Sequence, residues 1–337
     1  MMTDAKLRKL PVYGRIFPNR EPLAGSGCKG LIANHIFPIF VRMETKPIIA
    51  AIAYDFDGTL APGNMQEHSF LPKLGIEKGD FWAEANRIAA ENDMDGILSY
   101  MRLMLQKANE KNIPIRREDF VEFGRDISFF PGVEAWFDCI NRYAEHRGIR
   151  LEHHIISSGL REFISGTSIA KHFRNIFASG FKYDANGVAE WAALAINYTN
   201  KTQYLFRINK GIDNSHDNTL INKHLPEEEK PVPFSRMIYI GDGETDVPSM
   251  KMLKYQGGAT IAVYPVDTAG PGETSRTGDS PLTAEQNKQL QLCRDLLAQD
   301  RVDFIAPADY RAGSPLDTTI RLLIDRIRIN EALKDQE

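Results

Sequence analysis

Two aspartates close the first strongly apolar segment of the chain. Asp55 and Asp57 follow the run Ile48–Tyr54, and Phe56 separates them. Side chains alternate along an extended chain, so the two carboxyl groups are expected to point the same way. One carboxylate can then attack phosphorus while the other gives and takes the proton of the leaving oxygen. This pair is therefore the first candidate for a catalytic centre.

The next two residues are expected to shape the turn that follows the pair. Gly58 permits a tight turn, and the hydroxyl of Thr59 can hydrogen-bond locally to hold it. An aspartate-rich turn could also be part of a calcium loop, but the further oxygen ligands at the spacing of such a loop are missing. For this segment taken alone, an ordinary surface turn remains the alternative.

A second acidic pair follows another apolar run later in the chain. Asp242 lies between Gly241 and Gly243, and Asp246 comes four residues later. Mg²⁺ prefers oxygen ligands, so Asp242 beside Asp55 makes a candidate magnesium site, with the two glycines leaving room for the ion. Asp246 is expected to support the metal's water molecules. The alternative is that both aspartates serve only a turn and a helix N-cap.

Hydroxyl, amide and ammonium donors between these pairs could bind an anion. Ser157, Ser158 and Gly159 end a third apolar run, where the Ser157 hydroxyl and nearby backbone N–H groups could donate to phosphoryl oxygens. Lys201 begins an apolar helical pattern and could neutralise a bound phosphate. Lys210 is the rival for this role.

Other side chains with potential chemistry are less distinctive. His153 and His154 lie in or just before a strand and are expected to be structural. Arg102, Arg116 and Arg117 are possible anion contacts, but they also fit an ordinary charged surface.

The elements that must position these residues alternate between strands and helices. Short apolar runs predict strands at 48–54, 154–157, 237–241, 260–263 and 302–306. An amphipathic helix is expected from Val133 to Tyr143, ending before Gly148. This alternation predicts an α/β fold with a doubly wound parallel sheet, whose ligands bind at the carboxyl ends of the strands.

Residues 62–131 break the alternation and read as a helical insertion. Phe81 to Lys111 is predicted to be helical, with Ile97, Met101 and Met104 on one face that forms the insertion's own core. Because the insertion follows the first acidic pair, it could close over the site as a cap. Asn186-Gly187 predicts a hairpin turn, and 213–233 and 265–281 are expected to be loops.

Length and composition indicate a globular protein with more than one folding unit. The chain has 337 residues, with 41 basic and 45 acidic side chains, so its charge favours neither nucleic acid nor a membrane as partner. No apolar run is long enough for a membrane span, and the three scattered cysteines suit a reducing cytoplasm. Residues 1–48 are expected to be an N-terminal extension, of which residues 1–42, upstream of Met43, are expected to be dispensable for catalysis. Oligomeric state is not predicted.

Together, the motifs resemble those of the haloacid dehalogenase-like hydrolase superfamily. These are Asp-x-Asp at 55–57, a strand-terminal Ser157, Lys201 and Gly-Asp-Gly-x-x-Asp at 241–246, in that order. The resemblance implies a Rossmann-like core at 49–61 and 132–337, with 62–131 as a helical cap of the C1 type. Phe130-Pro131-Gly132-Val133 and Ser157-Ser158-Gly159-Leu160 are similar to the phosphoserine phosphatase branch. Asn64 stands where that branch is expected to have a substrate-binding glutamate, although Glu67 is near.

The resemblance also implies a mechanism. Asp55 would attack a small-molecule phosphate monoester to form an aspartyl-phosphate, and Asp57 would deprotonate the water that hydrolyses it. Mg²⁺ would bind Asp55, the backbone carbonyl of Asp57, and Asp242, with Asp246 in support. Lys201 and the segments at Thr59 and at 157–159 would bind the phosphate.

Two other functions remain open at this point. A phosphomutase would use the same nucleophile, and a catalytically silent protein would only bind its ligand. Asp57 argues against a dehalogenase, since a leaving halide needs no proton.

Overall fold

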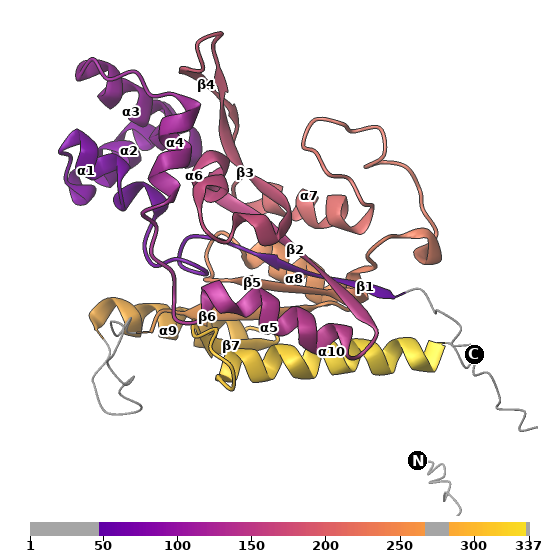
Figure 1. Ribbon diagram of the computed structural model, residues 1–337. Coiled ribbons are helices and arrows are strands. Elements are labelled where there is room, and N and C mark those ends of the chain that lie inside the picture. Colours follow the sequence, from indigo (N-terminus) through magenta and orange to yellow (C-terminus); the bar gives the residue numbers. More distant parts are fainter. Residues whose placement is uncertain (1–46, 267–282, 335–337) are drawn as a thin grey trace, which may run out of the picture. The chain divides into compact units, whose positions relative to one another are not determined.

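The computed structural model describes residues 47–266 and 283–334, in which seven strands form one sheet with the order β4-β3-β2-β1-β5-β6-β7 (Figure 1). All neighbouring strands are parallel except β3 and β4. The strands are β1 (Ile48–Tyr54), β2 (Ile149–Leu160), β3 (Phe173–Tyr183), β4 (Ala189–Leu194), β5 (Met237–Gly241), β6 (Ala259–Tyr264) and β7 (Phe304–Pro307).

Strand β1 lies at the centre of the sheet, between β2 and β5. Tyr54 is in register with Ile155 on one side and with Ile240 on the other. From β1 the chain builds outward in both directions, so the strand order changes direction at this point. In open α/β sheets, ligands bind at the carboxyl ends of the strands beside such a switch. Asp55 and Asp242 both follow strands at this position.

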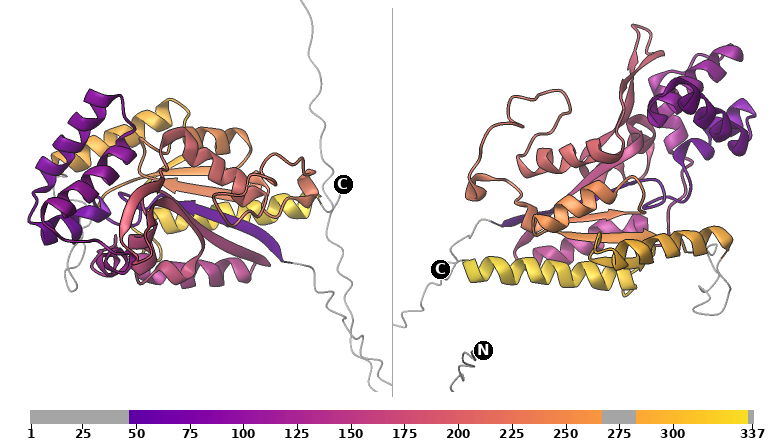
Figure 2. Two further views of the ribbon diagram at one scale, coloured as in Figure 1. Left: turned by 90° about the horizontal axis from the view of Figure 1, so that it is seen from above. Right: turned by 180° about the vertical axis from the view of Figure 1, so that it is seen from behind.

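Helices cover both faces of the sheet (Figure 2). One face packs Ile52 and Ile238 against α5 (Val133–Glu145) and α10 (Pro315–Lys334). The other packs Ala53 and Tyr239 against α7 (Tyr198–Asn209), α8 (Val247–Tyr255) and α9 (Ala284–Ala298). Because both faces are covered, the central strands β1 and β5 are apolar without interruption. The predicted doubly wound α/β fold is confirmed.

The segment 62–131 consists of helices, but its predicted long helix is two helices. Its elements are η1 (Met65–Glu67), α1 (Phe70–Leu74), α2 (Lys78–Asn92), α3 (Gly96–Glu110) and α4 (Arg117–Gly124). A continuous helix over 81–111 is wrong, because Asp93 has a left-handed φ of 47° and ends α2. Asp95 then accepts hydrogen bonds from the N–H groups of Ile97 and Leu98 and caps α3.

The two ends of this helical segment lie side by side. Phe130 N donates to the carbonyl of Leu60 at 3.0 Å, so the chain returns next to its point of departure. The segment is also fixed to the sheet-forming part where α4 packs on α6 (Arg161–Gly166). The predicted domain boundaries, including the cap at 62–131, remain a prediction.

The hairpin predicted at Asn186-Gly187 joins β3 to β4, and Gly187 adopts a φ of 77°. Strand β3 itself was not predicted. Loop 213–233 holds only η3 (Glu227–Glu229) as regular structure, and η2 (Ala170–His172) and η4 (Phe234–Arg236) are further short turns.

The loop predicted at 265–281 lies almost wholly outside the described residues, and residues 1–46 lie wholly outside them. No helix within the described ranges combines the length and hydropathy that crossing a bilayer requires.

Candidate active site

The first acidic pair lies where β1 ends. Asp55 continues the strand direction, and its N–H donates to the carbonyl of Ile240 on β5 at 2.9 Å. The chain then turns through Gly58, whose φ is 72°. Asp57 Oδ1 accepts a hydrogen bond from the N–H of Met65 at 2.9 Å, at the start of the helical segment. The sheet therefore fixes the backbone of Asp55, and the helical segment fixes the carboxylate of Asp57.

The second acidic pair approaches the first. One carboxylate oxygen from each of Asp55, Asp242 and Asp246 lies within 4.8 Å of the others. A Cβ at Gly58 would lie 2.4 Å from Asp242 Oδ2, so the two loops meet closely there. A Cβ at Gly241 would lie 2.3 Å from Asp246 Oδ2. Gly241 therefore makes room for the Asp246 carboxylate, where the sequence suggested room for the ion.

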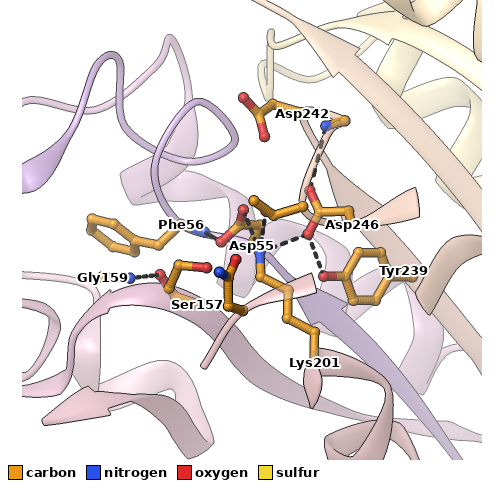
Figure 3. Close-up of polar contacts among 12 residues, drawn as sticks. Asp55, Phe56, Ser157, Gly159, Lys201, Tyr239, Asp242 and Asp246 are labelled. Atoms are coloured by element: carbon orange, nitrogen blue, oxygen red, sulfur yellow. Dashed lines mark hydrogen bonds and ion pairs between the residues drawn. The ribbon is translucent and has the colours of Figure 1, made fainter. Parts of the chain in front are cut away.

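Lys201 joins the two acidic loops (Figure 3). It lies in the first turn of α7, is completely buried, and its Nζ is 2.8 Å from both Asp55 Oδ2 and Asp246 Oδ1. Asp246 also accepts a hydrogen bond from the hydroxyl of Tyr239 at 2.7 Å. Lys210 lies at the opposite end of α7, where its Nζ donates to the carbonyl of Lys223 at 2.7 Å. Of the two candidate lysines, only Lys201 reaches the acidic pairs.

Burial and like charges together raise the pKa values of Asp55, Asp57 and Asp242. Burial raises the pKa of Asp55 to about 6, although Lys201 opposes the shift. Burial and the Asp55 charge raise the pKa of Asp57 well above its usual value. Burial, Asp246 and Asp55 do the same to the pKa of Asp242. Burial favours the neutral form of Lys201, but Asp246 and Asp55 raise its pKa overall, so it remains an ammonium. The site accumulates negative charge that one lysine does not balance.

Of the hydroxyl-bearing residues predicted to bind the phosphate, the structure places the two serines in the pocket and the threonine outside it. Ser157 is buried and its Oγ accepts a hydrogen bond from the N–H of Gly159 at 3.0 Å, which leaves the hydroxyl proton free to donate elsewhere. Ser157, Ser158 and Gly159 all face the same pocket as Asp55. Thr59 is buried outside that pocket, and its Oγ1 finds no hydrogen-bond partner within the described residues. The expected local bond of the Thr59 hydroxyl is therefore wrong.

A pocket of about 490 Å³ opens between the carboxyl ends of the strands and the helical segment. The helical segment contributes Asn64, Gln66, Trp82, Asn86, Gly96, Ile97 and Tyr100, and the remaining wall comes from Asp55, Asp57, Ser157, Ser158, Gly159, Asn197, Tyr198, Asp242, Glu244, Thr245 and Gln289.

Of the pocket-lining residues in the helical segment, the sequence marked Asn64 as a position expected to meet the substrate and assigned Ile97 to the segment's own core, and it did not identify the other five. Trp82 on α2 and Tyr100 on α3 contact each other edge to face, with ring centroids 5.7 Å apart, and nothing in their spacing along the chain signals this pairing.

The three arginines considered as anion contacts lie elsewhere. Arg116 precedes α4 as its N-cap residue, Arg117 stacks over the ring of Tyr183 at 4.4 Å, and Arg102 is exposed. The two histidines are structural, as expected. His153 is bonded to Tyr54 at 3.0 Å, and His154 is buried.

The donor set fits a divalent magnesium ion. Asp55, Asp242 and Asp246 offer hard oxygen ligands at the spacing of a shared site, and a cation would relieve the repulsion that raises the pKa values of Asp55 and Asp242. The Asp242 carboxylate has no hydrogen-bond partner within the described residues, whereas Asp246 is already bonded to Lys201 and Tyr239. Asp55 and Asp242 are therefore the better direct ligands, with Asp246 supporting them.

The fold and the acidic pocket together define an α/β enzyme whose site lies at the switch point of a parallel sheet. The model of the haloacid dehalogenase-like hydrolase family matches residues 52–251, which is more than half of the sequence. The chain therefore belongs to this hydrolase family, as its motifs indicated.

Individual relatives are more distant. An uncharacterized protein of Borreliella burgdorferi is 28% identical over 237 residues, which covers 63% of this chain and 80% of that protein. Among solved structures, a HAD family hydrolase of Salmonella enterica serovar Typhi is 19% identical, with a TM-score of 0.44, covering 65% of this chain and 64% of the other. A probable phosphoserine phosphatase of Vibrio cholerae is 13% identical, with a TM-score of 0.43, covering 77% and 69%.

Proposed function

We propose that this hydrolase is a magnesium-dependent phosphatase that acts on small-molecule phosphate monoesters through an aspartyl-phosphate. One observation carries the proposal: Asp55, Asp242 and Asp246 converge at the end of the central strands, with Lys201 bonded between Asp55 and Asp246. A carboxylate nucleophile beside a cation site and a fixed ammonium suits a substrate that brings its own negative charge.

In the first proposed step, a carboxylate oxygen of Asp55 bonds to phosphorus as the ester P–O bond breaks. Lys201 holds the Asp55 carboxylate in position through the hydrogen bond at 2.8 Å. The departing oxygen needs a proton, and Asp57 is the proposed donor. The raised pKa of Asp57 is consistent with a carboxyl group that keeps its proton near neutral pH.

In the second step, water attacks phosphorus, the bond to Asp55 breaks and Asp57 takes the proton back. Inorganic phosphate is released and both carboxyl groups return to their starting state. Mg²⁺, when bound at Asp55 and Asp242, would supply Lewis-acid stabilisation of the phosphoryl oxygens. The Ser157 hydroxyl and the backbone N–H groups of the same segment are the proposed donors to these oxygens.

The decisive experiment measures phosphate release from a panel of metabolite esters with Mg²⁺. Asp55→Asn is expected to lower kcat by at least about a thousandfold, since no nucleophile remains. Asp138→Asn, which changes an aspartate whose side chain is 71% exposed outside the pocket, is the matched control and should retain activity.

Three results would contradict the proposal. Isomerisation of a sugar phosphate without net phosphate release would indicate a phosphomutase. Failure of the wild type on every ester would favour a protein that only binds its ligand. Full activity of Asp55→Asn would exclude Asp55 as the nucleophile.

A further inference from the structure

The wall that would face the leaving group contains no cationic side chain. Among the described residues, the pocket is lined by no lysine, arginine or histidine, and Lys201 lies fully buried behind Asp55. The helical segment contributes neutral groups instead, namely the amides Asn64, Gln66 and Asn86 and aromatic rings. A substrate with a second anionic group would therefore find no charged partner there.

One lysine of the helical segment, Lys78, pairs with a glutamate outside the pocket. Glu67 Oε1 accepts hydrogen bonds from Asn64 Nδ2 at 2.8 Å and from Trp82 Nε1 at 2.9 Å. Its other oxygen pairs with Lys78 at 3.5 Å, and neither Glu67 nor Lys78 lines the pocket. Glu67 thus orients the neutral residues Asn64 and Trp82 toward the ligand, and it holds Lys78 outside.

The opposite wall adds negative charge. Glu244, two residues after Asp242, lines the pocket and is exposed. A carboxylate on the leaving group would be repelled by Glu244, and no cation in the described pocket lining would offset this repulsion. A second phosphate would be repelled more.

Two buried polar atoms in the pocket lack partners and point to a hydroxyl-bearing ligand. Gln66 is only 1% exposed, and its Oε1 has no hydrogen-bond partner within the described residues. The hydroxyl of Ser158 is likewise buried and without a partner there. Unpaired buried polar groups are costly, so a ligand that bonds to them gains affinity. Whichever way the Gln66 amide is turned, a hydroxyl group can bond to it.

We propose that the substrate is the phosphate ester of an uncharged, hydroxyl-bearing alcohol, and that esters with an added carboxylate are poor substrates. This inference rests on the proposed phosphatase function and narrows its substrate class. It predicts that amino-acid phosphates such as phosphoserine are disfavoured, despite the motifs shared with the phosphoserine phosphatase branch.

The test compares pairs of esters that differ in one carboxylate. Glycerol 3-phosphate is expected to exceed 3-phosphoglycerate in kcat/KM at least tenfold, which corresponds to about 1.4 kcal/mol. The phosphate ester of ethylene glycol should exceed phosphoglycolate in the same way. Equal or reversed preference in both pairs would overturn the inference.

A matched pair of variants tests the electrostatic cause. Asn86→Lys adds a cation to the pocket wall on α2, and we expect it to reduce the glycerol 3-phosphate preference at least threefold. Asn92→Lys makes the same change at an exposed position of α2 outside the pocket and should leave the preference unchanged. An unaltered preference in Asn86→Lys, or an equal reduction in both variants, would contradict the proposed cause.

Binding to Asp55→Asn separates this inference from the proposed function. Titration of that variant in Mg²⁺ with each glycerol-derived ester should show tighter binding of glycerol 3-phosphate. If the wild type hydrolyses no ester but this binding preference is present, the phosphatase proposal fails and the pocket inference stands. If neither ester is hydrolysed or bound, or if 3-phosphoglycerate binds more tightly, the inference is overturned.

Discussion

Gly58 is the residue where the two acidic loops come closest. Its φ of 72° is unfavourable for other residues, and an added Cβ would lie 2.4 Å from Asp242 Oδ2. Since Asp242 is the proposed metal ligand, the position of its carboxylate depends on the absence of a side chain at residue 58.

We therefore expect Gly58→Ala to lower kcat by about tenfold or more and to raise the Mg²⁺ concentration needed for half-maximal activity, because a misplaced ligand weakens a metal site. Gly148→Ala is the matched control, since Gly148 also has a φ of 72° but no atom within 4 Å of its added Cβ. Both variants carry the same backbone strain. A similar loss of activity in both would show that strain alone explains the effect.

At the residue scale, the sequence predicted the side chains at strand and helix ends better than it predicted the side chains of the helical segment that line the opposite wall of the pocket. Asp55, Asp242 and Lys201 were predicted from strand and helix ends, and the structure brings them together. Gln66 and Trp82 could not be predicted, because which side of a helix meets the pocket depends on packing between distant segments. The Thr59 hydroxyl was misassigned for the same reason, since burial placed it away from the pocket.

Among the elements, α4 and α6 approach each other through two glycines. A Cβ at Gly124 would lie 1.9 Å from the carbonyl oxygen of Phe163, and one at Gly166 would lie 1.8 Å from that of Val121. Backbone rather than a flexible side chain blocks the added atom in both cases. The contact joins the helical segment to the sheet-forming part.

Gly124→Ala should therefore destabilise the protein by more than about 2 kcal/mol, since the two backbones must separate. Gly79→Ala in α2 is the control: nothing lies within 4 Å of its added Cβ, and alanine there should stabilise the helix by roughly 0.5–1 kcal/mol. Urea unfolding of the two variants and the wild type measures both effects. A Gly124→Ala protein as stable as the wild type would contradict the close approach.

The sequence predicted the central strands more reliably than the outer elements. Strands β1 and β5 are unbroken apolar runs and were predicted with their observed bounds. Strand β3 contains Asn175, Gly180 and Lys182 among its apolar residues, so its pattern resembled a loop. The break between α2 and α3 contains neither glycine nor proline before Gly96, and only the capping potential of Asp95 could have revealed it.

At the scale of the whole molecule, a buried hydrogen-bond chain connects β1, β2 and α5. Trp136 Nε1 donates to the hydroxyl of Tyr54 at 3.0 Å, and Tyr54 bonds to His153 Nδ1 at 3.0 Å. His153 Nε2 lies 2.9 Å from Asn141 Oδ1. Because the indole can only donate, the directions that satisfy every group leave Nδ1 of His153 without a proton.

This buried chain of hydrogen bonds predicts that the free energy of unfolding decreases in acid. Burial lowers the pKa of His153 to about 3, below the unfolded value of 6.5, so the unfolded state binds the proton more readily. The free energy of unfolding should therefore fall as the pH drops from about 6.5 toward 3. Over this range, His153 alone can raise the unfolding equilibrium constant by up to about tenfold for each pH unit. The lowered pKa of His154 acts in the same direction.

Urea unfolding between about pH 7.5 and 4.5 measures this dependence. His153→Gln should be less stable at neutral pH and show a shallower loss of stability on acidification, since its side chain cannot take up the proton. His146→Gln, at an exposed position, should follow the wild type. An unchanged slope in His153→Gln would rule out His153 as the source.

The acidic site should couple metal binding to global stability. Mg²⁺ at 100 times its Kd is expected to stabilise the wild type by about 2.7 kcal/mol, because only the folded chain brings the carboxylates together. Asp242→Asn should lose this gain, and Glu244→Gln should keep it, since Glu244 lies on the exposed rim of the pocket. Thermal unfolding with Mg²⁺ and with a chelator measures the difference. A full metal-dependent gain in Asp242→Asn would exclude that residue as a ligand.

The bond between Phe130 N and the carbonyl of Leu60 has a consequence for how such a protein can diversify. Since the chain departs and returns through adjacent backbone groups, the length and content of residues 66–129 can change while Met65, whose N–H holds the Asp57 carboxylate, keeps its place. In the proposed phosphatase, substitutions in that stretch would change which alcohol is accepted, and the chemistry at phosphorus would stay the same. Grafting the corresponding stretch of a relative between Met65 and Phe130 is a direct route to new selectivity.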